Sequence, residues 1–152
     1  MVTTYTVLKT IHVLASVVWV GGGMVLVGLA LRARRAREGA RLATIVKELT
    51  FVGPRVFAPA GLILVGTGIW MAADGDLPYD LWVILGLVGW GATFVTGNFF
   101  LGPQSKKLDE ALDARGPDDP EAAALMSRIL TVARVDILIL TLVVADMVIK
   151  PD

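Results

Sequence analysis

Four long runs of apolar residues alternate with polar links along this chain. The runs cover residues 5–31, 51–73, 81–103 and 129–149. A helix needs about 20 consecutive apolar residues to cross the hydrocarbon core of a bilayer, and each run reaches that length. No internal repeat and no second domain is evident. The pattern therefore predicts an all-α fold with one domain over residues 1–152, built as a four-transmembrane-helix bundle.

The composition agrees with a chain that is embedded in a lipid bilayer. Of its 152 residues, 55% are hydrophobic and only 18% are charged, whereas soluble domains are charged at about a quarter of their positions. The chain lacks cysteine, which excludes disulfides and thiolate metal sites. Its arginines lie beside the apolar runs, where membrane topology explains them, so no nucleic-acid partner is expected.

The positions of lysine and arginine predict the orientation. Six cations lie in or near the link after the first run: Arg32, Arg34, Arg35, Arg37, Arg41 and Lys47. Four more follow the third run: Lys106, Lys107, Arg115 and Arg128. Because cytoplasmic links are enriched in cations, both links should be cytoplasmic and both termini outside. An aromatic belt is expected at the outer boundary, formed by Tyr5, Trp70, Tyr79 and Trp82.

Local signals predict the helix ends. Asp80 can cap the third helix by accepting hydrogen bonds from free backbone amides. Asp119 followed by Pro120 is typical of a cap and a first helical residue, so the fourth helix should begin in the cytoplasm and run unbroken into the membrane. Both cytoplasmic links are thus expected to carry helical extensions. Pro54 and Pro59 should kink the second helix or mark its true start.

Charged side chains inside a bilayer are costly, so each is a candidate for function. One predicted layer, near the cytoplasmic side, holds Arg55 on the second helix and Asp136 on the fourth, with Asn98 at similar depth. A structural ion pair between Arg55 and Asp136, locking two helices together, is the plainer interpretation. A path for protons or substrate is the alternative.

A second predicted layer lies nearer the outer side and contains the chain's one histidine, His12. A polar face of the first helix follows the spacing of three and four residues, and it should point into the bundle. Lys9 on this face could pair with Asp146, because both lie near the outer ends of their helices. The face comprises Lys9, His12, Ser16, Trp19 and Gly23.

His12 is the strongest candidate for a ligand. It lies at about the same depth as four glycines on other helices, which would leave room for a flat group such as a haem macrocycle. Lys9, one turn above, would face the propionates. The competing interpretation is packing, since glycines let membrane helices approach closely and a histidine can simply hydrogen-bond across them. The candidate cofactor-binding residues are His12, Lys9, Ser16, Gly66, Gly68, Gly86 and Gly89.

Copper is the other metal hypothesis. Thioether ligands suit cuprous copper, and Met24, Met71, Met126 and Met147 could supply them. These methionines are scattered in depth, and a single histidine makes a poor copper cage, so copper ranks below haem. A hydrolytic site at Ser16 and His12 ranks lower still, because no Gly-x-Ser-x-Gly turn exists.

Residues 8–23 (LKTIHVLASVVWVGGG) carry a distinctive first-helix motif. Together with residues 55–59 (RVFAP), 67–70 (TGIW) and 97–103 (GNFFLGP), the chain resembles a bacterial membrane family named domain of unknown function 2269. The first helix is also similar to copper-resistance-protein-D-like domains and to HemJ-type protoporphyrinogen oxidases, small membrane proteins that bind haem b through a first-helix histidine. His12 matches that histidine, and Arg32 falls where the HemJ group places an arginine. The resemblance implies haem ligation; porphyrinogen oxidation is not carried over, because the group's remaining motifs are not matched.

The leading prediction is a b-type haem-binding protein of the bacterial inner membrane, with His12 as axial ligand and a redox, electron-transfer or haem-handling role. Oxidoreductase activity would be compatible with it. The second axial position could be empty, or held by water, a methionine, or His12 of a second subunit in a homodimer. The alternatives are a copper- or solute-handling protein of the copper-resistance type and a structural or accessory membrane subunit.

Overall fold

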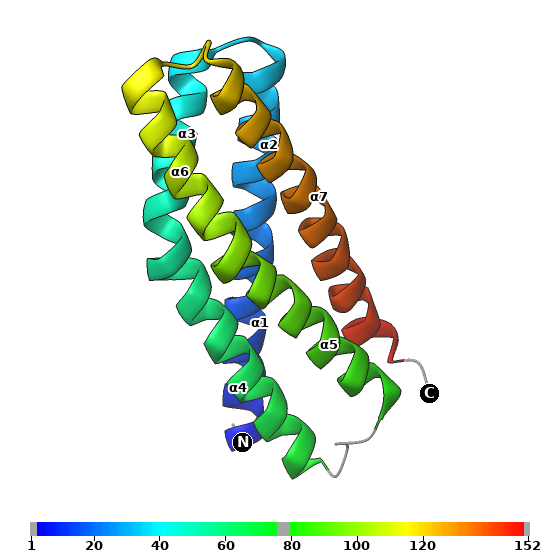
Figure 1. The fold of residues 1–152 in the computed structure, drawn as a ribbon. Coiled ribbons are helices and arrows are strands. Elements are labelled where there is room, and N and C mark those ends of the chain that lie inside the picture. Colours follow the sequence, from blue (N-terminus) through cyan, green and yellow to red (C-terminus); the bar gives the residue numbers. More distant parts are fainter. Residues whose placement is uncertain (1–2, 76–79, 151–152) are drawn as a thin grey trace.

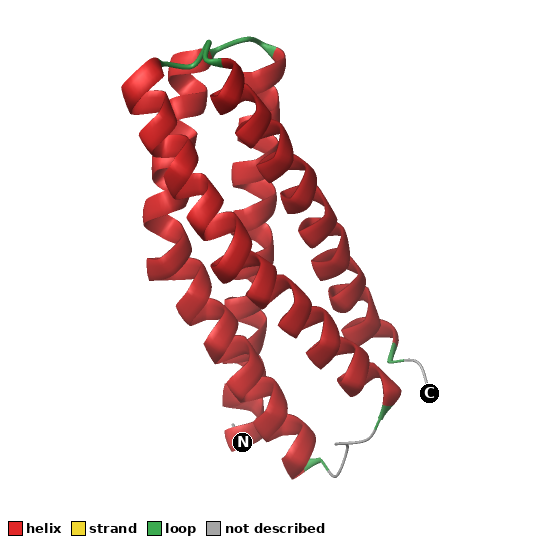
Figure 2. Cartoon of the chain, in the orientation of Figure 1, coloured by secondary structure: helices red, strands yellow, loops and turns green. Residues whose placement is uncertain are grey.

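The computed structural model describes residues 3–75 and 80–150, and in these residues it contains helices and no strand (Figures 1 and 2). The helices join end to end into four long rods, three of which contain a π-helical segment, labelled η. In chain order the elements are α1 (Thr4–Ser16), η1 (Val17–Gly21), α2 (Gly22–Arg35), α3 (Gly39–Val52), η2 (Gly53–Phe57), α4 (Ala58–Asp74), α5 (Leu81–Val95), η3 (Thr96–Leu101), α6 (Gly102–Arg115) and α7 (Pro120–Ile149).

Three of these rods, Thr4–Arg35, Gly39–Asp74 and Leu81–Arg115, are long and apolar enough to cross a membrane. Large apolar side chains such as Leu14 and Val88 point outward, which is unfavourable in water but suits a surface that faces lipid. The predicted all-α fold and three of the four spans are therefore confirmed by length and composition. The fourth span stays a prediction, because the apolar part of α7 carries several charged residues, namely Arg134, Asp136 and Asp146.

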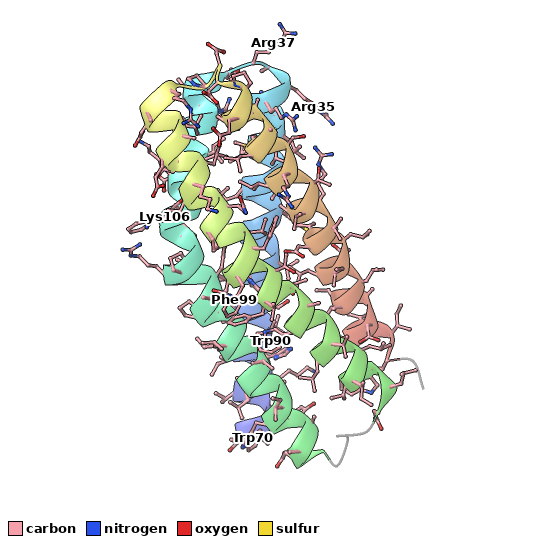
Figure 3. All side chains as sticks on the ribbon, viewed as in Figure 1. Arg35, Arg37, Trp70, Trp90, Phe99 and Lys106 are labelled. Carbon is pink, nitrogen blue, oxygen red and sulfur yellow. The ribbon has the colours of Figure 1, made fainter. Side chains whose placement is uncertain are left out.

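The two ends of the bundle differ in chemistry. Figure 3 shows Arg35 and Arg37 at one end and Trp70 at the other, where the N-terminus also lies. We call these the arginine end and the terminal end. Tyr5 and Trp70 are exposed at the terminal end, as expected of an aromatic belt. Tyr79, also predicted for that belt, lies outside the described residues.

One predicted cap is confirmed and one is wrong. The carboxylate of Asp119 accepts hydrogen bonds from the backbone amides of Glu121 and Ala122, at 2.8 and 3.1 Å. Asp80 occupies the cap position of α5, but its carboxylate accepts from the indole N–H of Trp82 at 3.2 Å instead of from a backbone amide. Pro54 lies within η2 and the helix continues through it, so it does not mark the start of the rod.

The main core lies at the arginine end, where α2, α3, α6 and the start of α7 pack around one another in a ring. It is built from aliphatic and small side chains, and Leu108 is its most deeply buried large residue, with 1% of its surface exposed. Ala30 and Ala33 are also fully enclosed, so α2 approaches its neighbours closely. The helical extensions therefore form a closed bundle in their own right.

Toward the terminal end the helices separate into two pairs. The main contact of α1 is with α4, and the main contact of α5 is with α7. A layer of large side chains midway along the bundle joins the two pairs, with Trp90 stacked on Phe94 and Trp19 edge-on to Phe94 (Figure 3). This arrangement leaves space on both sides of the layer.

Candidate functional site

A cavity of about 610 Å³ lies on the terminal side of the aromatic layer, between the α1–α4 pair and the α5–α7 pair. We call it the terminal cavity. Its walls are largely apolar, which is typical of sites for a cofactor or small molecule. The polar and sulfur-bearing side chains on its wall include Lys9, His12, Ser16, Met71, Met147 and Lys150.

His12 is half-buried in this wall and held by α4. Its Nδ1 lies 2.9 Å from the carbonyl oxygen of Leu64 and 3.1 Å from Oγ1 of Thr67. A carbonyl oxygen only accepts hydrogen bonds, so Nδ1 must carry the proton that it donates. In the neutral imidazole, Nε2 then keeps its lone pair, and it forms no hydrogen bond within the described part of the chain. Histidine ligands of metals are commonly oriented in this way, through a donated bond from the other ring nitrogen.

The glycines predicted to surround His12 divide into two groups. Gly68 and Gly86 line the terminal cavity. A Cβ at Gly68 would lie 3.1 Å from Cε1 of His12, so the imidazole packs directly on the backbone of α4. A Cβ at Gly86 would overlap the side-chain methyl of Met147.

Gly66 and Gly89 do not belong to the cavity, contrary to the prediction. Gly66 is exposed and has no neighbour where a Cβ would lie; it is two residues from Gly68 and so points to a different side of α4. A Cβ at Gly89 would overlap Val143 of α7, so this glycine permits close helix packing.

Cations lie at the open end of the terminal cavity. Lys9 lines the cavity from α1, and Lys150 lines it from the C-terminal end of α7. The Lys150 ammonium also lies over the Trp82 ring, 4.8 Å from its centroid. The expected Lys9–Asp146 ion pair is absent from the described structure. Oδ2 of Asp146 is buried without a partner there, because α7 packs against α5 while Lys9 belongs to the opposite helix pair.

Met71 and Met147 were underestimated from the sequence. Both line the terminal cavity together with His12, and the three residues come from three different helices. The four methionines are scattered in depth as a set, but Met71 and Met147 each lie near the terminal end of their helix, and this shared depth is the sequence signal that singles them out. Residues 3–75 and 80–150 hold no cluster of three His, Cys, Asp or Glu side chains. A metal in this cavity would therefore rely on His12 with thioethers or with a macrocycle.

The predicted Arg55–Asp136 ion pair is not formed. Arg55 is exposed, donates to the backbone carbonyl of Phe51 at 3.4 Å and places its guanidinium over the Phe51 ring, 4.2 Å from the centroid. Asp136 instead faces inward and is 9% exposed. Arg55 lies within η2, where the wider π-helical turn changes which side of the helix each side chain occupies. It points away from the bundle for this reason.

Residues 6–151 match a family model described as predicted integral membrane protein, DUF2269. The chain belongs to this family. The resemblance to DUF2269, which residues 8–23, 55–59, 67–70 and 97–103 predict, is thus confirmed over nearly the whole chain, and the protein is an integral, multi-pass membrane protein. No curated protein and no solved structure matches it. The similarity of its first helix to copper-resistance and HemJ-type proteins remains a prediction.

Proposed function

We propose that this chain binds haem b in the terminal cavity, with His12 as an axial ligand, and has a redox, electron-transfer or haem-handling role. One observation carries the proposal: Nδ1 of His12 donates to the Leu64 carbonyl at 2.9 Å, while Nε2 has no hydrogen-bond partner among the described residues, and His12 lines a cavity of about 610 Å³. An imidazole held in this way presents its free nitrogen to iron in a fixed orientation.

The other residues of the cavity fit the same group. Lys9 and Lys150 lie on the wall nearest the chain termini, where they would attract carboxylates such as propionates. The wall beside His12 is formed by the backbone at Gly68, which leaves the ring close to α4. A further ligand, if the group takes one, would be Met71, Met147, water or His12 of a second copy. When bound, haem would supply a one-electron iron couple, and the largely apolar walls of the cavity would limit access of water.

The test is the absorption spectrum of protein purified from haem-replete cells. We expect a Soret band and the visible bands of reduced b-type haem in the wild type. His12→Ala should lose these bands, with helical content in detergent unchanged. Lys9→Ala should retain them with binding weakened by about fivefold at most, because an exposed charge contact is worth only about 0.2–1 kcal/mol. A colourless wild type, or colour that survives in His12→Ala, would overturn the proposal.

Copper handling is the second candidate, and it is favoured by the presence of His12, Met71 and Met147 in one cavity. An imidazole with two thioethers is a donor set suited to cuprous copper. Metal analysis after loading with cuprous ions separates the two candidates. If the wild type binds copper and shows no Soret absorption, and if Met71→Leu and Met147→Leu each lose the copper, the copper proposal replaces the haem proposal. A protein that binds neither would be assigned as a structural or accessory subunit.

The proposed orientation places both termini outside a bacterial inner membrane, with the arginine end in the cytoplasm. It is supported by the cation-rich residues at that end, such as Arg35 and Arg37 (Figure 3), and by the positive-inside rule. Reporter fusions after residue 152 and within the link at residues 36–38 should report opposite sides. A cytoplasmic reporter that is active at position 152 contradicts this orientation.

A further inference from the structure

A second cavity, of about 530 Å³, lies between the aromatic layer and the core of the arginine end. We call it the central cavity. Trp19 and Leu140 line both cavities, so the two are separated by the thickness of one layer of side chains. Its volume is within the range of roughly 300–1,000 Å³ that is usual for sites of drug-sized ligands.

All three π-helical segments of the described structure converge on this cavity. Trp19 of η1, Phe57 of η2 and Asn98 of η3 lie on its wall, and Asp136 of α7 completes it from the fourth rod. Single-turn π-helical segments cost hydrogen-bond regularity and are found frequently at functional sites. Three such segments around one cavity would be unusual if the cavity wall served only for helix packing.

Asp136 is the polar centre of this wall. It is nine-tenths buried, and the ion pairs found in the described residues all involve other carboxylates. Thr93 and Asn98 direct their donor groups to backbone carbonyls of their own helix, at 2.8–3.1 Å, and so do not serve the carboxylate. The other charged residue on the wall, Lys106, is exposed at the flank of the bundle (Figure 3). Among the described residues, no salt bridge pairs this carboxylate with a cation, whereas a buried charge requires such a partner.

We infer that the central cavity binds an organic monocation with an apolar, drug-sized body. The carboxylate of Asp136 would neutralise the charge, while Trp19, Phe57 and Phe94 supply aromatic surfaces that attract cations. The size and apolar lining of the cavity fit a small hydrated ion poorly. They favour a larger organic cation that partitions into lipid. This site is independent of haem, which would occupy the other side of the aromatic layer.

The probe is tetraphenylphosphonium, with tetraphenylborate as an anion of matched size and shape. Binding is measured by equilibrium dialysis on the full chain in lipid nanodiscs, with empty nanodiscs subtracted. We expect saturable binding of the cation and none of the anion. Asp136→Asn should weaken the cation by at least about tenfold, because it removes the buried counter-charge at constant size, and Asp136→Glu should restore much of it.

Asp146→Asn is the matched control, since this carboxylate lies on the same helix but away from the central cavity. It should leave cation affinity unchanged, and Lys106→Gln should leave it unchanged or tighter because a like charge is removed. Absence of saturable binding above empty nanodiscs would overturn the inference. So would equal binding of the anion, or the same loss in Asp136→Asn and Asp146→Asn. His12→Ala should not affect this binding, so the haem proposal and the cation proposal can fail separately.

Discussion

The arginine end and the terminal end use the same four rods for different purposes. At the arginine end α2, α3, α6 and α7 close into a ring around small and aliphatic residues. At the terminal end the rods separate into two pairs, and the space between them is lined by His12 and methionines. Under the proposed function, this contrast would separate the residues that stabilise the fold from those that bind a ligand. The core at the arginine end is formed without the residues that line the terminal cavity, so these residues are not needed to hold the helices together there.

The most damaging single change should therefore lie at the arginine end. Leu108→Ala removes the most deeply buried large side chain and should lower the free energy of unfolding by about 2–5 kcal/mol, because the void cannot close fully. Unfolding in mixed micelles would measure it. If the arginine end stabilises the fold and the terminal end binds haem, this variant should keep the wild-type haem absorption per folded molecule. Leu142→Ala, at a position 61% exposed on the terminal half of α7, is the control and should cost far less.

A second substitution should alter the terminal cavity without lowering the stability of the fold. Gly68→Val places a side chain where even a Cβ would lie 3.1 Å from His12, so the imidazole must move and haem retention should fall severalfold. Gly66→Val carries the same helix-propensity change on an exposed face and should leave retention unchanged. Haem titration of the two purified variants makes the comparison. Equal losses in both would show that the wall at Gly68 does not position the ligand.

The smallest expected effect concerns the start of α7, which belongs to the arginine end. Hydrogen bonds from the backbone amides of Ala122 and Glu121, together with nearby Arg115, hold the pKa of Asp119 below its usual value. A lowered pKa in the folded state stabilises the helix start above the unfolded pKa of about 3.9, and the contribution is lost as pH falls through the folded value. The protection factors of the amides of residues 121 and 122, corrected for the intrinsic pH dependence of exchange, should fall slightly at low pH. Asp119→Ala should abolish this dependence and leave His12 unaffected.

The sequence by itself determined the elements of this protein. A long apolar segment in a bilayer must satisfy its backbone hydrogen bonds internally, and a helix does this. The all-α architecture and three spans therefore followed directly from the sequence. The cap at Asp119 was also predictable, because its hydrogen bonds are made within the next three residues of the chain. The inward position of His12 followed from the polar face of the first helix.

Only the tertiary structure decided which side chains share a cavity. Each π-helical segment inserts an extra residue into a helix, which rotates everything beyond it by about 100° relative to a regular 3.6-residue repeat. Arg55 lies inside such a segment and turns outward, so its ion pair with Asp136 could not be read from spacing. Gly66 and Gly68 point to different sides of α4 because they are two residues apart, and the packing of α1 on one of these sides decided which glycine contacts His12. Depth in the bilayer is a property of the sequence, but the direction a side chain faces depends on how the helices wind and pack.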